Sequence, residues 1–199
     1  RDKSECNDYG TFEDGVNATN NYLKRVIWMT GMNSRKSNIA SEKLVILIPN
    51  YNGEAFIKDT VESLINGFKD VRIVVVDDAS TDKSIDIINS IKNNRVRLIC
   101  KSVNGGFASA VNKGIRYCKE NDVEFAIVAN SDIDVTQKNC SDIVKSFYEF
   151  DKENVGVLGF LEFGDKGCRE NENISGFLFA LRLSVVDKVG YLDETFYMY

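Results

Sequence analysis

The chain has 199 residues, of which 43% are apolar and 28% are charged, and its formal net charge is −5. This composition is typical of a soluble globular domain, and the acidic balance argues against the basic face that nucleic-acid binding requires. Histidine is absent, which excludes Ser-His-Asp or Cys-His catalysis and zinc sites built on imidazole. Any chemistry must therefore come from carboxylates, amides, the backbone or a metal held by oxygen.

The chain divides near residue 42. Residues 1–42 are polar and show no regular apolar period, so we interpret them as a leader, a linker or the end of a preceding domain. Residues 43–199 alternate apolar runs with amphipathic stretches, and we interpret them as one domain. No apolar run reaches the ~20 residues of a transmembrane helix. A chain that starts at Arg1 rather than at Met is expected to be an excised or processed piece.

Four strand–helix units are predicted after residue 43, followed by two more strands and a short helix. Each of the first four strands is a short aliphatic run, which is typical of a parallel strand buried on both faces. Each is followed by apolar side chains at helical spacing. The strands are expected at residues 44–48, 72–76, 96–100, 124–129, 155–161 and 176–181; the helical stripes begin at Ile57, Ile85, Ala108 and Cys140, and the short helix covers 184–189 and ends at Gly190.

Polar residues just before the helical stripes are the expected helix caps. Asn52 precedes the first helix, Ser80 or Asp82 the second, and Thr136 the fourth. Consecutive β–α units place parallel strands in one sheet, because each helix carries the chain back to the same end. The predicted fold class is therefore α/β, with an open, mostly parallel sheet and helices on both faces.

The first four expected strands all end in polar clusters. Because the carboxyl ends of parallel strands meet at one edge of a sheet, these clusters are expected to share the edge where such sheets bind ligands. The one proline of the chain stands in the first cluster, where it also serves to terminate the strand. The clusters contain Pro49, Tyr51 and Glu54; Asp77 and Asp78; Asn104 and Gly105; and Asn130, Ser131, Asp132 and Asp134.

Each cluster has a structural and a functional interpretation. The adjacent carboxylates Asp77 and Asp78 either cap the next helix or accept hydrogen bonds from a base or a ribose. Asn104 and the two glycines after it form a plausible turn, but they also allow backbone amides to approach a phosphate. Asp132 and Asp134 are either solvated loop residues or oxygen ligands for Mg²⁺ or Mn²⁺ on a diphosphate.

The five cysteines show no C-x-x-C spacing, and their number is odd. Cys100 and Cys118 stand in apolar surroundings and are expected to be buried. We interpret all five as reduced thiols of a cytosolic protein.

The order of these motifs resembles glycosyltransferase family 2, whose fold is called GT-A. The resemblance rests on L-V-I-L-I-P-N-Y-N-G-E, I-V-V-V-D-D-A-S-T-D, N-G-G-F-A-S-A-V-N-K-G-I and A-N-S-D, in that order, and it covers residues 44–199. The third motif is most similar to the branch that includes rhamnosyltransferase-like enzymes. The stretch from Ile174 to Phe196 is similar to the acceptor-side segment of the family.

The resemblance implies inverting transfer of a sugar from a UDP- or dTDP-sugar to an acceptor hydroxyl, on a glycan or a lipid-linked acceptor, in the synthesis of a surface polysaccharide. It implies work in the cytoplasm or at the cytoplasmic face of the membrane, with Mn²⁺ or Mg²⁺ as cofactor. It also implies residue roles. Pro49, Tyr51 and Glu54 would line the nucleotide pocket; Asp77 or Asp78 would bind the base; residues 104–112, including Asn104, Gly105 and Asn112, would hold ribose and phosphates; Asn130, Ser131 and Asp132 would fill the D-x-D position, with Asp132 as metal ligand and Asp134 as a weaker one.

The general base of the family follows the segment that contains D-E-x-F-x-x-Y, at a point just after Tyr199. Asp193 and Glu194 are the candidate carboxylates inside the chain, although in the family they resemble structural or acceptor-side residues. We therefore expect a domain truncated at its C-terminus that binds donor but transfers sugar about 10²–10⁴-fold more slowly than a longer form.

Three alternatives remain open from the sequence. The chain is a donor-binding module without its base, or a haloacid-dehalogenase-like phosphatase, or a nicotinamide-binding domain. The phosphatase pattern D-x-D-x-T occurs from Asp132 to Thr136, but it should follow the first strand rather than the fourth. The nicotinamide alternative lacks the G-x-G-x-x-G turn after the first strand.

Overall fold

The computed structural model describes residues 43–135, 143, 156–159 and 178–196. Within these ranges, every strand and helix expected from the sequence is present, with ends that differ by a few residues. The helix predicted after Thr136 lies outside the described residues except for Ile143, which is helical and buried. The elements are β1 Leu44–Asn50, α2 Ile57–Gly67, β2 Arg72–Asp77, α3 Ser84–Ser90, β3 Val96–Cys100, α4 Gly106–Glu120, β4 Phe125–Ala129, β5 Val157–Gly159, β6 Leu178–Arg182 and α6 Leu183–Val189.

The strands form one six-stranded sheet in the order β3-β2-β1-β4-β6-β5. The four strands β1 to β4 are parallel, as the β–α repeat predicts. Strand β6 is antiparallel to β4, and β5 is antiparallel to β6. The expected α/β class with an open, mostly parallel sheet is therefore confirmed.

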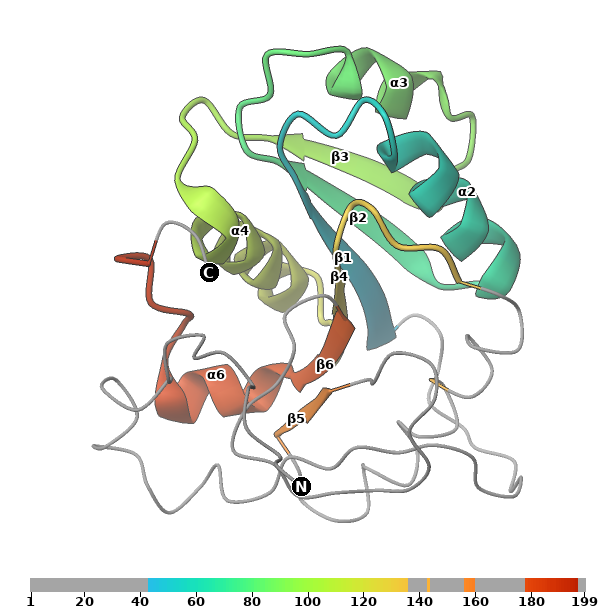
Figure 1. Cartoon of the computed structure of the whole chain (residues 1–199). Coiled ribbons are helices and arrows are strands. Elements are labelled where there is room, and N and C mark those ends of the chain that lie inside the picture. The colour runs from blue at the N-terminus through green and yellow to red at the C-terminus, as the bar shows by residue number, and fades with distance from the viewer. Residues whose placement is uncertain (1–42, 136–142, 144–155, 160–177, 197–199) are drawn as a thin grey trace, which may run out of the picture.

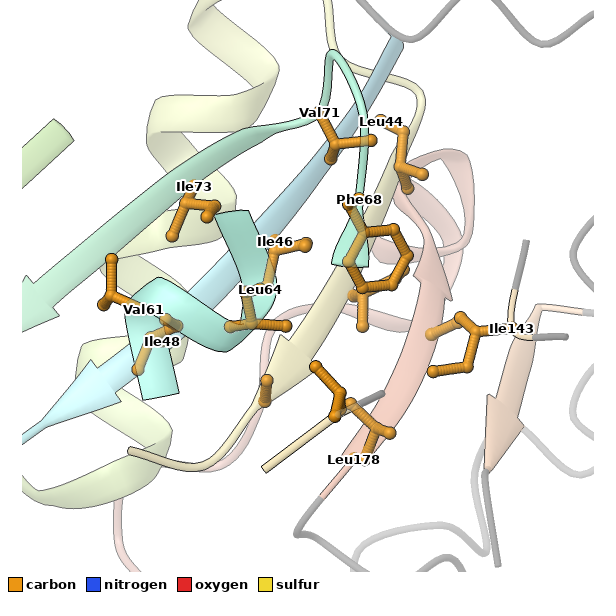
Figure 2. Packing of buried hydrophobic residues seen from close by; sticks show 14 of the residues in the cluster. Leu44, Ile46, Ile48, Val61, Leu64, Phe68, Val71, Ile73, Ile143 and Leu178 are labelled. Carbon is orange, nitrogen blue, oxygen red and sulfur yellow. The ribbon is translucent and has the colours of Figure 1, made fainter. Parts of the chain in front are cut away.

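Two apolar layers cover the sheet, one on each face. Helix α2 lies over one face and α4 over the other (Figure 1). Successive side chains of a strand point to opposite faces, so β1 supplies Ile46 and Ile48 to the α2 layer and Leu47 to the α4 layer. Figure 2 shows Ile46 and Ile48 of β1 beside Val61 and Leu64 of α2, with which they share one buried cluster. Burial of β1 on both faces explains why its sequence is a continuous aliphatic run.

The expected helix caps differ from those that the structure shows. Helix α2 begins after Phe56 and α3 after Lys83, and neither preceding residue caps its helix with a side chain. Asp82 comes closest to the prediction, because its carboxylate accepts from the Ser84 amide at 2.9 Å. Asn52 and Ser80 are not caps, since their polar atoms bond to each other's loops, as described below.

The two predicted core cysteines have different environments. Cys118 lies in α4 and is buried between that helix and the sheet, and burial raises the pKa of its thiol to about 12. Cys100 is exposed, which corrects the expectation that it is a core residue. The reason is its place on β3, which pairs with β2 alone and is an edge of the sheet. No helix in the described part of the chain is long and apolar enough to cross a bilayer.

Candidate functional site at the carboxyl edge of the sheet

Strands β1 and β4 separate at the carboxyl edge. The pairing of β1 with β2 continues to Asn50 and Asp77, whereas its pairing with β4 ends at Leu47 and Val128. Pro49 lies in β1 beyond that last pair, so the strand continues past it rather than ending there. A proline is tolerated at this point because no β4 carbonyl requires its missing N–H. Ligands of open α/β sheets bind where neighbouring connections diverge, and that place here is between β1 and β4.

A buried hydrogen-bond network forms the floor of the edge beside β2. The Asn50 side-chain amide donates to Asp77 Oδ2 at 2.8 Å, and the Ser80 amide donates to Asp77 Oδ1 at 2.8 Å. The Ser80 hydroxyl also donates to Asp77 Oδ2 at 2.6 Å and accepts from the Asn52 amide at 2.9 Å. Asp77 is completely buried. Its carboxylate therefore holds the loop after β2 in place and presents no exposed atom to a ligand.

The loops after β1 and β2 are joined by reciprocal bonds. Asn52 Oδ1 accepts from the Thr81 amide at 2.8 Å. The Glu54 amide donates to Asp82 Oδ2 at 2.9 Å, and Glu54 Oε2 accepts from the Lys83 amide at 3.0 Å. We call this set of contacts between residues 52–54 and 80–83 the loop clasp. It fixes the two loops to each other, so they form one wall of the site.

Asp78 occupies the start of α4. Its carboxylate accepts from the amides of Gly105 at 3.0 Å and Gly106 at 2.7 Å, and it pairs with the Lys101 ammonium. Asn104 Oδ1 also accepts from the Gly106 amide, at 3.0 Å. The amides expected to face a phosphate are thus held by a protein carboxylate. A phosphate would reach them only by displacing Asp78, so phosphate binding here stays a prediction, as does base binding by Asp77 or Asp78.

The residues expected to line a nucleotide pocket have unequal access to solvent. Tyr51 is 50% exposed and Glu54 is exposed, both on the loop after β1. Pro49 is buried within its strand. An exposed tyrosine ring beside the point where β1 and β4 separate offers a flat surface on which a base can stack.

The loop after β4 forms the opposite wall. Thr60 of α2 anchors it, because its hydroxyl lies 2.8 Å from the carbonyl oxygen of Ser131. Asn130 and Ser131 are half-buried, while Asp132 and Asp134 are exposed and make no hydrogen bond or ion pair with any described residue.

The two exposed carboxylates fit a divalent ion that takes most of its ligands from elsewhere. No cluster of three or more metal-binding side chains occurs among the described residues. Mg²⁺ and Mn²⁺ are commonly held by one or two carboxylates, with water and substrate phosphates completing the shell. Asp132 and Asp134 can supply these one or two carboxylates. A metal bound here would take its other ligands from water and substrate.

Asn112, which the resemblance places among the residues that hold ribose and phosphates, has its side chain engaged by the protein. Its side chain is fully buried and its amide bonds the C-terminal segment: Oδ1 accepts from the Leu192 amide at 2.9 Å, and Nδ2 donates to the Leu192 carbonyl at 2.8 Å. Nδ2 also donates to Glu194 at 2.9 Å. With every polar atom of this side chain in use by the protein, the structure favours a docking role, and a nucleotide contact by Asn112 stays a prediction.

Asp193 and Glu194, the candidate bases, are both stabilised as carboxylate anions. The Thr195 amide and hydroxyl donate to Asp193, at 2.9 and 2.7 Å, and lower its pKa. The hydrogen bond from Asn112 lowers the pKa of Glu194. A lowered pKa makes a carboxylate a weaker proton acceptor. The geometry therefore favours structural roles, and catalysis by either residue stays a prediction.

Two cavities in the described region lie away from this edge. One, of about 520 Å³, is lined by Lys43, Arg72 and residues 121–122, where the β1 and β2 strands begin. The other, of about 340 Å³, lies between α2 and α3. Neither contains a residue that the sequence predicted for the site. Loop chemistry at the carboxyl edge, rather than cavity size, identifies the candidate site.

Sequence reasoning missed two residues that organise the edge. Lys101 pairs with Asp78, and Thr60 anchors the loop after β4. Ser109, which lies in the 104–112 stretch expected to hold ribose and phosphates, accepts from the Lys101 ammonium at 2.9 Å. Lys101 directly follows β3, so its place after a strand was an available signal. Thr60 lies within a helix and carries no comparable signal.

Comparison with protein families gives one match, to the model described as glycosyl transferase family 2, over residues 45–190. Among curated proteins, the chain is 29% identical over 144 residues to the glycosyltransferase GlyG of Streptococcus pneumoniae, covering 65% of this chain and 47% of GlyG. It is 36% identical over 118 residues to the poly(ribitol-phosphate) beta-glucosyltransferase of Bacillus spizizenii, covering 56% of this chain and 18% of that protein.

Solved structures share the fold. TarS of S. aureus in complex with UDP has a TM-score of 0.61 and 23% identity, covering 78% of this chain and 51% of the other. The mannosyltransferase PcManGT of Pyrobaculum calidifontis in complex with GDP-Man and Mn²⁺ has a TM-score of 0.63 and 16% identity, covering 76% and 48%. These are GT-A glycosyltransferases, which confirms the expected fold.

The chain spans about half or less of the length of these relatives. The family match nevertheless covers residues 45–190, which are most of the residues after 43. The order of strand-end motifs, the GT-A sheet and the family model agree, and the chain belongs to glycosyltransferase family 2.

Proposed function

We propose that this domain is the donor-binding part of an inverting glycosyltransferase that moves a sugar from a UDP- or dTDP-sugar to an acceptor hydroxyl. One observation carries the proposal. The point where β1 and β4 separate is flanked by the exposed Tyr51 ring on one loop and by the exposed Asp132 and Asp134 carboxylates on another. An aromatic face suits a pyrimidine base, and free carboxylates suit a metal-bound diphosphate.

The chemistry divides between a bound metal and the residues of this chain. A divalent ion would neutralise charge on the leaving diphosphate when bound. Asp132, with Asp134 as a weaker ligand, would hold that ion at the end of β4, and Tyr51 would fix the base. Asp77 would act indirectly, by holding the loop that carries Ser80.

The comparisons support the donor and acceptor classes. A structure with this fold binds UDP, and another binds GDP-Man with Mn²⁺. A relative acts on poly(ribitol-phosphate), and others are named for teichoic acid biosynthesis. We therefore propose a glycan or lipid-linked acceptor in the synthesis of a surface polymer. The motif that begins at Asn104 further suggests the rhamnosyltransferase-like branch. The free thiols Cys100 and Cys118 agree with work in the cytoplasm or at the cytoplasmic membrane face.

Calorimetric titration with UDP, dTDP, GDP and ADP, each with and without Mn²⁺, tests the proposal. We expect UDP or dTDP to bind more tightly than either purine nucleotide. Tyr51→Ala should weaken UDP binding about tenfold, since stacking of one base contributes about 1–3 kcal/mol. Phe56→Ala is the matched control, because Phe56 is an exposed aromatic on the same loop. Equal affinity for UDP and ADP, or equal effects of both substitutions, would contradict the proposal.

The lowered pKa of Asp193 and Glu194 favours a second candidate, a donor-binding unit that lacks its general base. Following the family resemblance, we propose that the base belongs to the acidic pair that the family carries after the position of Tyr199. Donor binding would then persist in this chain, while transfer would be about 10²–10⁴-fold faster in a form extended through that pair. Equal transfer by both forms would assign the base to Asp193 or Glu194.

A further inference from the structure

A buried polar side chain lies near the centre of α4. Asn112 is fully buried in a helix whose neighbouring inward residues are apolar. A buried amide is tolerated when its donors and acceptor are satisfied. All hydrogen-bond partners of the Asn112 side chain lie 80 or more positions away in the sequence. They are the backbone of Leu192 and the carboxylate of Glu194. Asn112 therefore holds the C-terminal segment of residues 190–196 against α4.

Glu194 receives two more donors from the same helix. Hydrogen bonding from the Ser109 hydroxyl lowers the pKa of the Glu194 carboxylate, and Arg116 Nη2 lies 3.5 Å from Glu194 Oε1. Ser109, Asn112 and Arg116 are spaced by three and four residues, so they lie along one side of α4. Glu194 is thus bound along about two turns of the helix, from a point near its start.

Ser109 also connects this segment with the loop after β2. Its Oγ accepts from Lys101 Nζ at 2.9 Å, and the same ammonium pairs with Asp78. The side chains of Lys101 and Asp78 are only 15% and 4% exposed. Because its oxygen accepts from Lys101, the one hydrogen of the Ser109 hydroxyl is left for Glu194, whose pKa this hydroxyl lowers. These side chains form a series from Asp78 to the C-terminal segment, and we call Asp78, Lys101, Ser109, Glu194 and Asn112 the α4 polar line.

We propose that Ser109 and Asn112 are positioning residues, and that the α4 polar line couples the donor-side loop of residues 101–106 to the C-terminal segment of residues 190–196. Hydrogen bonds in series polarise one another, so a change in the partner of Lys101 alters the bond that Ser109 offers to Glu194. The ligand part of this inference rests on the proposed function: a nucleoside diphosphate at the edge would act on Asp78 or Lys101. Its effect would then reach Leu192 through residues that touch no ligand.

The first test uses the protein without nucleotide. Hydrogen exchange of the Leu192 amide reports docking, because that amide donates to Asn112. Lys101→Met keeps the aliphatic stem and removes the charge. It should speed Leu192 exchange about tenfold, the size expected for one charge-assisted hydrogen bond. Lys113→Met, which removes a charge from an exposed position of α4, is the matched control and should leave the rate within about twofold. Exchange at Ile127 in β4 corrects for global opening.

A double-mutant cycle distinguishes coupling from general destabilisation. Ser109→Ala keeps the Asp78–Lys101 pair and a good helix former, and it should speed Leu192 exchange on its own. In the Ser109→Ala background, Lys101→Met should add no more than about twofold, because its path to Glu194 is already broken. Equal effects of Lys101→Met in both backgrounds, or equal effects of Lys101→Met and Lys113→Met, would overturn the inference. If Lys101→Met does not fold, an unchanged Leu192 rate in Ser109→Ala overturns it.

The ligand arm separates this inference from the proposed function. At saturating UDP, Leu192 exchange should change severalfold in the native protein and remain constant in Ser109→Ala. UDP that binds by calorimetry without affecting Leu192 would overturn the coupling. Failure of UDP to bind would contradict the proposed function, while the Lys101 and Ser109 substitutions would still decide the coupling.

Discussion

The loops after β2 and β4 both carry closely spaced aspartates, yet the structure uses them in opposite ways. After β2, Asp77 and Asp78 are buried and their oxygens are engaged by protein donors. After β4, Asp132 and Asp134 are exposed and unbonded to any described residue. Asp77 and Asp78 therefore hold the loops of the carboxyl edge in place, whereas Asp132 and Asp134 are available to a ligand. An aspartate of this edge has a structural role when it is buried and accepts from protein donors, and it is free to bind a ligand when it is exposed and unbonded.

The largest expected effect tests the scaffold half of the comparison. Asp77→Ala leaves the Asn50 side-chain amide and two donors of Ser80 without their acceptor. Since hydrogen bonds to charged groups contribute about 1.5–3 kcal/mol each, we expect a loss of about 3 kcal/mol or more in the free energy of unfolding, measured by urea denaturation. Asp132→Ala is the matched control and should cost at most about 0.5 kcal/mol. Similar losses in both variants would remove the distinction.

Glycine 53 offers a sharper probe of the buried floor. A Cβ at Gly53 would lie 2.2 Å from Asn50 Oδ1, an oxygen that has no hydrogen-bond partner among the described atoms. Asn50 cannot turn away without leaving Asp77. Gly53→Ala should therefore destabilise the fold by about 1–3 kcal/mol, measured by thermal and urea unfolding.

A double-mutant cycle identifies the cause of that loss. In an Asn50→Ala background the colliding atom is gone, so Gly53→Ala should cost distinctly less than in the native protein. Additive losses would show that the substitution acts elsewhere.

The ligand half of the comparison predicts a binding effect without a stability effect. Asp132→Ala should abolish the Mn²⁺-dependent strengthening of UDP binding, a loss of about tenfold or more, or about 1.4 kcal/mol. Asp134→Ala should weaken it less, because Asp134 lies further along the loop from β4. Calorimetry with and without Mn²⁺ measures both. A larger effect at Asp134 would place the main metal ligand two residues further from the strand than the D-x-D alignment does.

The smallest effect concerns pH. Hydrogen bonding from Asn112 lowers the pKa of Glu194 below its ordinary value of 4.5, so its contribution to docking is present above pH 4.5 and lost as the pH falls through the lowered value. We expect the Leu192 amide resonance to shift below pH 4.5, and Glu194→Gln to flatten that titration. The Thr195 amide, which donates to Asp193, reports the neighbouring carboxyl separately. An unchanged titration in Glu194→Gln would assign the shift to another group.

The sequence predicts the sheet well because its signals are local. The aliphatic runs at residues 44–48 and 72–76 are strands for the reason inferred, burial on both faces. Strand neighbours are not local, so the exposure of Cys100 followed only from the edge position of β3. The pattern of apolar residues likewise does not predict that β6 pairs antiparallel with β4.

The candidate site is only partly predictable for a related physical reason. Tyr51 and Asp132 follow predicted strands in the sequence, and this position alone places them at the carboxyl edge of the sheet. It does not say which polar groups bond to each other once there. Asn112 is an example. The motif around it predicts a ligand contact, and the sequence gives no signal of its bond to Leu192 because that residue is 80 positions away.

The loop clasp has a consequence for folding. Its bonds join residues 28 or 29 positions apart, such as Glu54 with Asp82 and Asn52 with Thr81. Contacts at that separation form only after the intervening chain has closed, so neither loop can take its final shape while β1 and β2 are unpaired. The wall that the loop clasp forms is thus a late product of chain collapse, and a peptide covering β1 and α2 alone should be unable to reproduce it. Slow pairing of β1 with β2 would delay formation of the proposed ligand site even when helices α2 and α3 have already formed.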